Sequence, residues 1–248
     1  MKNITAIISS CHKQEFIAFE ALRNLSLILP LWNRISRVII TLPELNLKEI
    51  RNESFSYENT SIVLIRDDDQ GCLMAYDKAL NYIDTEIIYF MMDDRPITTY
   101  NLSKLDKAIN IFQTSNIEAL RLNNEGPMPF SGKLIAKINN NNTYKTSLTN
   151  ILLRKEFFKK LIREHKNIWE IDKFGGHDNK CFAPSMINYF DPLIDVSHLI
   201  FRGKVLQNSN SNLFNRKLKN KIKSNVYLFI KIYNYFYRKL FPIYSIFE

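Results

Sequence analysis

The chain has 248 residues, with 34 lysines and arginines against 25 aspartates and glutamates, a formal net charge of +9. Residues 1–201 hold equal numbers of bases and acids, so the whole excess lies in residues 202–248, where ten bases stand against one acid. A neutral body with a basic tail argues against a fold that binds nucleic acid over its own surface. The 46% of hydrophobic residues exclude a disordered chain, and six glycines and eight prolines are too few for a fibrous one.

Apolar runs and helical spacings alternate over the first 120 residues. Continuous apolar runs predict strands, whereas apolar residues three and four positions apart predict helices. Strands are predicted at 4–8, 37–41, 62–65 and 86–92, and helices at 15–29, where Pro30 ends the helix, and at 71–83. Buried strands joined by helices are typical of an α/β fold, a mostly parallel sheet with helices on both faces. In such sheets the ligand site lies beyond the carboxyl ends of the strands.

The pattern beyond residue 100 is less regular. The predicted elements are a helix at 102–112, strands at 118–122 and 146–153, helices at 156–165 and 176–182, and a strand at 196–201. The polar run 207–212 then marks a boundary before the basic tail.

Acidic residues follow two of the predicted strands. Asp67, Asp68 and Asp69 follow the third strand, and Asp93 and Asp94 follow the fourth. Two adjacent carboxylates at the end of a buried strand are costly unless they face a polar mouth, a cation or a hydrogen-bonding ligand. Their oxygens suit Mg²⁺ or Mn²⁺ bridged to a diphosphate. The alternative is structural, with Asp93 capping the next turn and Asp94 paired with its neighbour Arg95.

The run from Gly71 to Asp94 resembles the core of the GT-A glycosyltransferases, in which a glycine-led helix precedes a buried strand ending in an Asp-x-Asp motif. That resemblance implies a GT-A (Rossmann-like) fold, a nucleotide-diphosphate sugar donor and a Mn²⁺ or Mg²⁺ cofactor. Here Met92 takes the place of the first acid of the motif. We therefore predict Asp94 as the metal ligand, assisted by Asp93.

A looser resemblance extends to about residue 205. Segments 146–157, 169–172 and 201–204 resemble elements of bacterial cell-surface polysaccharide transferases, such as those of capsule and lipopolysaccharide. It implies a catalytic domain at 1–207, with a nucleotide-sugar-binding half at 1–122 and an acceptor half at 123–207. Residues 208–248 form a separate C-terminal extension.

Glycosyl transfer with inversion needs a carboxylate that deprotonates the acceptor hydroxyl. Glu170 and Asp172 are the candidate bases, and Trp169 beside them is the candidate acceptor-binding ring, which could stack on a sugar. In an extended segment both acids point the same way, so periodicity does not separate them. The structural alternative buries Trp169 in the core and leaves both acids in solvent.

The donor would be held by polar residues at the strand ends and on the first helix of the motif. Arg202 and Lys204 could neutralise the leaving diphosphate, and His198 could contact the metal or a phosphate. Each also has a structural alternative, as part of the basic tail or as an ordinary strand histidine. The candidate donor-binding residues are Ser9, His12, Asp68, Asp77, Asp93, Arg202 and Lys204.

The tail has an amphipathic pattern. Between Val226 and Leu240 apolar residues share one side of a predicted helix, and five bases precede it between 216 and 223. This favours the surface of an anionic membrane as partner of residues 208–248, with packing on the body or on a second subunit, a homodimer, as the alternative. No uncharged stretch is long enough for a spanning helix, and three cysteines fit neither a disulfide framework nor a zinc site. We therefore expect a cytoplasmic protein, peripheral on the inner face of the membrane.

Three functional hypotheses follow. The preferred one is a metal-assisted, inverting glycosyltransferase that moves a sugar to a glycan or lipid-linked acceptor in surface polysaccharide synthesis. A sugar-phosphate nucleotidyltransferase is the second, although its glycine-rich N-terminal loop is absent from residues 9–13. The third is a non-catalytic protein that binds membrane or nucleic acid through its basic tail.

Overall fold

A computed structural model describes residues 2–10, 15–44, 51–68, 72–126, 128–139, 145–176, 180–196, 200–201 and 204–205. The chain divides into two compact units, residues 1–197 and 198–248. The described part of the second unit is a short antiparallel pair of strands, β12 (Ile200–Phe201) and β13 (Lys204–Val205).

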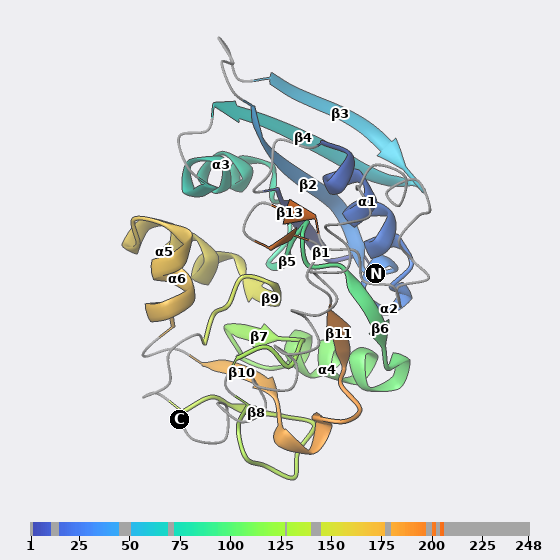
Figure 1. Cartoon of the computed structure of the whole chain (residues 1–248), viewed down its shortest axis with the longest axis vertical. Coiled ribbons are helices and arrows are strands. Elements are labelled where there is room, and N and C mark those ends of the chain that lie inside the picture. The colour runs from blue at the N-terminus through green and yellow to red at the C-terminus, as the bar shows by residue number, and fades with distance from the viewer. Residues whose placement is uncertain are drawn as a thin grey trace. The chain divides into compact units, whose positions relative to one another are not determined.

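A nine-stranded sheet forms the centre of the first unit (Figure 1). In spatial order its strands are β3 (Arg51–Tyr57), β4 (Thr60–Asp68), β2 (Ile35–Glu44), β1 (Ile4–Ser9), β5 (Ile87–Met92), β9 (Asn150–Arg154), β7 (Ala119–Arg121), β10 (Cys181–Pro184) and β8 (Ile135–Lys137). The pairings give β4, β2, β1, β5, β7 and β10 one direction and β3, β9 and β8 the other. The predicted α/β class with a mostly parallel sheet is confirmed.

Helices cover both faces of the sheet, and an apolar core lies between the sheet and the helices on each face (Figure 1). One core contains side chains of α1 (Glu15–Ser26), α2 (Leu29–Trp32) and α4 (Leu102–Thr114). The other contains side chains of α3 (Cys72–Ala79), α5 (Lys155–Glu164) and α6 (Ile168–Phe174). Two 3-10 turns, η1 (Leu80–Tyr82) and η2 (Met186–Asn188), and a small antiparallel sheet of β6 (Ile97–Tyr100) and β11 (Ile194–Val196) complete the unit. The predicted layering, with helices on both faces of the sheet, is therefore present.

Strand β5 shows why the site lies where it does. Its side chains alternate between the two cores, with Tyr89 and Met91 in the first and Ile88 and Phe90 in the second. All four are fully buried, so the strand is fixed on both faces up to its carboxyl end. The acids that follow at positions 93 and 94 are consequently held at the edge of the sheet.

The structure corrects two helix predictions. Helix α1 ends at Ser26, and Pro30 lies in the first turn of α2 rather than at a helix end, because the first turn does not need the N–H that proline lacks. The helix predicted at 176–182 is wrong over its last residues, since Cys181 and Phe182 belong to β10 and pair in parallel with β7. Residues 177–179 lie outside the described part.

Two strand predictions are also corrected. The strand predicted at 196–201 is two separate strands, β11 and β12, on either side of residues 197–199, which lie outside the described part. The segment RNESFSY was not predicted, yet it forms β3 and pairs antiparallel with β4. It is an edge strand whose side chains from 53 to 56 are exposed, so it lacks the apolar run that marks an interior strand.

Candidate active site

The candidate site lies where the carboxyl ends of β1, β5 and β7 meet the beginning of the antiparallel strand β9. Ser9 at the end of β1 is in register with Met92 at the end of β5, and Met91 is in register with Asn150 at the start of β9. Residues that follow these strands therefore share one edge of the sheet.

Asp93 and Asp94 stand at the centre of this edge. Asp93 is 1% exposed, and its backbone N–H donates to the Ser9 carbonyl oxygen at 2.9 Å. The Asp94 side chain is 14% exposed, and its Oδ1 lies 4.0 Å from Nε of Arg95. Strand β5 thus directs two carboxylates to one place, one buried and one partly open.

This carboxylate pair fits a divalent cation of the predicted kind. Mg²⁺ is commonly bound by one or two carboxylates together with substrate phosphates, so a full protein cage is not needed. Among the described residues no group of three or more histidine, cysteine, aspartate or glutamate side chains could hold a metal by itself. Asp94, with Asp93 beside it, would therefore supply the protein's share of the ligands and a donor diphosphate the rest.

A hydrogen-bonded network next to the acids was not predicted from the sequence. Nη1 of Arg95 donates to both carboxylate oxygens of Glu125, at 2.8 and 2.9 Å. The side-chain amide of Asn123 donates to Glu125 at 3.2 Å and to the Thr149 hydroxyl at 3.1 Å, and Asn150 donates to the Arg95 carbonyl at 3.3 Å. The network joins the ends of β5 and β7 to the start of β9. Only the polar residues just after the predicted strand at 118–122 could have indicated it.

Asp172 is the acid of α6 that turns toward this edge. Its Oδ1 accepts the backbone N–H of Leu148 at 2.9 Å. Burial raises the pKa of Asp172 to about 6, against the Leu148 hydrogen bond and the positive charge of Arg95, which both lower it. The electrostatic effect of Arg95 links Asp172 to the network around Asp94. A carboxylate with a pKa near 6 can exchange a proton at neutral pH.

Glu170 has a different position, because the segment is a helix rather than extended. Residue Asn167 caps α6 by accepting the Glu170 N–H at 3.0 Å, and the Glu170 carboxylate accepts the Lys166 N–H at 2.9 Å. Two residues of a helix that are two positions apart point in different directions. Glu170 therefore stabilises the start of α6 while Asp172 faces the Leu148 backbone. Trp169 is 75% exposed on the same helix, open to a ligand rather than packed in the core.

Ser9 and Asp77 were both predicted to bind the donor. The Ser9 side chain is fully buried and its hydroxyl shares a 2.6 Å hydrogen bond with the Tyr76 hydroxyl, so it ties β1 to α3. Asp77 is exposed on α3, whereas its neighbour Tyr76 faces the core. Ser9 acts on the site through its carbonyl oxygen, which holds Asp93. Donor binding by either side chain stays a prediction.

The remaining predicted residues are not described at the side-chain level. His12, His198 and Arg202 lie outside the described residues. Asp68 is the last residue of β4, and Lys204 begins β13 in the second unit. Their proposed contacts with nucleotide, metal or phosphate stay predictions, as does the partner of residues 208–248. Within the described segments no helix is both long and apolar enough to cross a membrane.

Comparison with known proteins finds matches among solved structures, and these are similarities of fold alone. No protein-family model and no curated protein matches the chain. The chain is similar to residues 1–349 of TarS from S. aureus, with 12% identity, a TM-score of 0.46, and coverage of 77% of this chain and 62% of that chain. It is equally similar to the mannosyltransferase PcManGT from Pyrobaculum calidifontis, solved with GDP-Man and Mn²⁺, with 12% identity, a TM-score of 0.46, and coverage of 81% and 58%.

A cytidylyltransferase from Leptospira borgpetersenii is also similar, with 13% identity, a TM-score of 0.40, and coverage of 69% of this chain and 68% of that chain. The structural neighbours thus include glycosyltransferases and nucleotidyltransferases. The chain spans less than two thirds of the length of TarS 1–349 and of PcManGT. The functional interpretation therefore rests on the residues of the site.

Proposed function

We propose that the chain is a glycosyltransferase that moves a sugar from a nucleotide-diphosphate donor to a glycan or lipid-linked acceptor. The observation that carries the proposal is the meeting of two kinds of carboxylate at one sheet edge. Asp93 and Asp94 stand at the end of β5, next to Arg95. Asp172, whose pKa burial raises, is close enough to Arg95 for that positive charge to lower its pKa in part. Asp93 and Asp94 suit the binding of a cation with a diphosphate, and Asp172 suits proton transfer.

The donor diphosphate would lie at the end of β5. Asp94 would hold a Mn²⁺ or Mg²⁺ ion there, with Asp93 assisting, and such an ion supplies positive charge that stabilises the departing nucleoside diphosphate. Asp93 is fixed for this by its backbone hydrogen bond to Ser9. The Arg95 guanidinium is oriented by its two hydrogen bonds to Glu125. Its charge partly offsets the negative charges that gather at this edge.

Asp172 is the proposed general base, and Glu170 is not, because Glu170 caps α6. Asp172 would accept the proton of the acceptor hydroxyl while that oxygen attacks the anomeric carbon and the bond to the diphosphate breaks. Attack on the face opposite the leaving group gives inversion. The Leu148 N–H fixes the orientation of the carboxylate at 2.9 Å, and exposed Trp169 offers a ring face to the acceptor sugar.

The finer proposals concern the setting of the reaction. We place the enzyme in bacterial surface polysaccharide synthesis, on the inner face of the cytoplasmic membrane. The resemblance of segments 146–157 and 169–172 supports the first, and the basic amphipathic pattern of residues 208–248 supports the second.

A donor screen followed by product analysis tests the proposal. The chain is titrated with UDP, GDP and dTDP in the presence of Mn²⁺ or Mg²⁺, and the sugar nucleotide of the base that binds is then supplied. A transferase releases the nucleoside diphosphate, whereas a nucleotidyltransferase given a sugar phosphate and a nucleoside triphosphate releases pyrophosphate. Asp172→Asn should bind donor and lose turnover, and Glu170→Gln is the matched control that should keep both. Release of pyrophosphate would overturn the proposal.

A further inference from the structure

Two neighbouring segments of the first unit present bulky apolar side chains to solvent. We define the aromatic patch by its five exposed members, which are Phe130, Met186, Ile187, Tyr189 and Phe190. Phe130 and Phe190 are 94% and 95% exposed. The segments are joined, since the Met186 N–H donates to the Pro129 carbonyl at 3.0 Å, and they lie beside β8 and β10 (Figure 1). Clustered exposed apolar side chains mark an interaction surface more often than scattered ones do.

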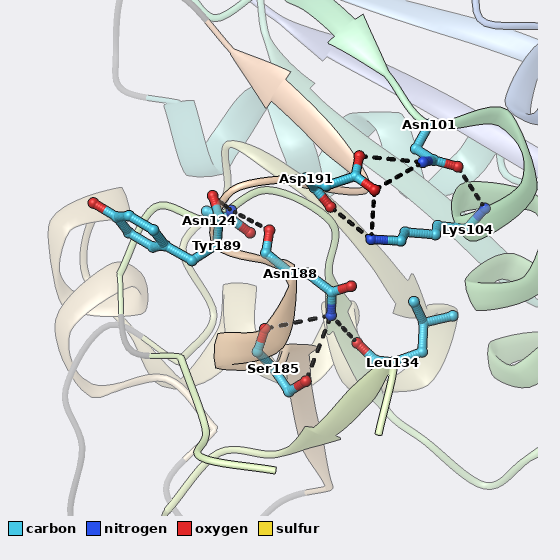
Figure 2. A network of polar contacts seen from close by, with 8 residues as sticks. All are labelled: Asn101, Lys104, Asn124, Leu134, Ser185, Asn188, Tyr189 and Asp191. Carbon is cyan, nitrogen blue, oxygen red and sulfur yellow. Dashed lines mark hydrogen bonds and ion pairs between the residues drawn. The ribbon is translucent and has the colours of Figure 1, made fainter. Parts of the chain in front are cut away.

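The backbone beneath the aromatic patch is braced by buried polar groups (Figure 2). The amide of Asn188, which is 1% exposed, donates to the carbonyls of Leu134 at 2.8 Å and Ser185 at 3.3 Å. The amide of Asn124 donates to the carbonyls of Asn188 at 3.2 Å and Tyr189 at 3.4 Å. The Tyr189 and Phe190 rings pack edge to face, with centroids 5.1 Å apart. The rings are therefore held outward by a fixed scaffold.

The charges around the aromatic patch favour an anionic partner. Residues 128–139 and 180–190, which contain the patch members, include lysines and no acid, and Lys133 and Lys137 are exposed. The residue that follows Phe190 in the chain is Asp191, whose carboxylate lies 2.9 Å from the Lys104 ammonium and also accepts the Asn101 amide (Figure 2). Its negative charge is thus neutralised within the fold.

We propose that the aromatic patch inserts into the surface of an anionic lipid bilayer. A ring that is more than nine-tenths exposed does not lie in a pocket. A sugar or a peptide would cover one face of such a ring, whereas a bilayer would surround it on all sides. Protruding aromatic and aliphatic side chains flanked by lysines match the apolar interior and the anionic headgroups of such a surface. This membrane site is distinct from residues 208–248, and it does not depend on the proposed transferase activity.

Asn124 connects the backbone beneath the patch to the candidate active site. Asn124, which holds the carbonyls of Asn188 and Tyr189, stands between Asn123 and Glu125 of the network around Arg95. Insertion of the patch would therefore bring the network close to the bilayer surface. Under the proposed transferase function, a lipid-linked acceptor would then reach the site without leaving the membrane.

Site-specific fluorescence separates this surface from the tail. The full chain with Phe190→Trp is mixed with vesicles of equimolar phosphatidylglycerol and brominated phosphatidylcholine, whose bromine atoms quench tryptophans that enter the bilayer. The matched control is Met74→Trp, at a residue of α3 that is 45% exposed, and the wild type supplies the background of Trp32 and Trp169. We expect strong quenching and a blue shift at position 190 and no change at position 74.

A binding measurement completes the test. Phe130→Ser with Phe190→Ser should weaken vesicle binding about tenfold or more, since tenfold corresponds to about 1.4 kcal/mol and burial of one phenylalanine side chain contributes at least that much. Because both rings are exposed, the thermal midpoint and nucleotide binding should stay at wild-type values. The proposal is overturned if vesicles bind the chain without quenching position 190, if they do not bind it, or if the double variant abolishes a concentration-dependent dimer.

Discussion

Replacement of Asp172 by asparagine should stabilise the protein above neutral pH while it removes activity. In the folded chain the pKa of Asp172 is raised from 3.8 to about 6, so the ionised carboxylate is less favourable in the folded state than in the unfolded state. Its contribution to stability is fully present below pH 3.8 and is lost as the pH rises through about 6. Asparagine keeps an Oδ1 that can accept the Leu148 N–H bond and carries no charge.

The size of the effect follows from the shift. A change from 3.8 to about 6, at about 1.36 kcal/mol per pH unit, amounts to roughly 3 kcal/mol. Urea unfolding of wild type and Asp172→Asn at a series of pH values should therefore give equal stabilities below about pH 4 and an advantage of roughly 3 kcal/mol for the variant near pH 8. Glu170→Gln controls for the loss of one negative charge from α6. A stability difference that does not change with pH would refute the argument.

Further predictions concern the same edge and the patch scaffold. Arg95→Met should move the acidic limb of the pH–rate profile to higher pH, because the Arg95 charge lowers the pKa of Asp172. An acidic limb at the wild-type pH would count against this effect of Arg95 on Asp172. Asp172→Asn should lower the turnover at least about a hundredfold with donor affinity kept, whereas Glu170→Gln should stay near wild type; comparable losses in both, measured as initial rates, would contradict the assignment. Asn188→Ala should cost about 1–3 kcal/mol in urea unfolding, since it leaves buried carbonyls without their donor; an unchanged midpoint would contradict the bracing role.

The interior of the sheet could be predicted from the sequence because burial leaves a strong signal. Strands β1 and β5 are continuous apolar runs covered on both faces, and their predicted positions agree closely with the observed ones. Edge strand β3 has no such signal, because its exposed side chains can be polar. The acids after β5 were found for the same reason as the strand, since they end its apolar run.

The network around Arg95 could not be predicted, because its members come from three strands that are neighbours only after folding. Glu125 lies 30 positions after Arg95 in the chain, yet the two side chains are 2.8 Å apart. The choice between the two candidate bases was open to prediction. Asn167 followed three positions later by Glu170 has the spacing of a helix-capping pair, and a helix there would have separated Glu170 from Asp172.

The central claim is that the end of β5 binds a nucleoside diphosphate together with a divalent cation. Isothermal titration of the wild type and of Asp94→Ala with UDP, GDP and dTDP, each with and without Mn²⁺, tests it most directly. We expect one nucleotide to bind in a metal-dependent manner and Asp94→Ala to weaken that binding at least about tenfold, the loss of one charge-assisted ligand. If no nucleotide binds with metal present, or if Asp94→Ala binds as tightly as the wild type, the claim is contradicted.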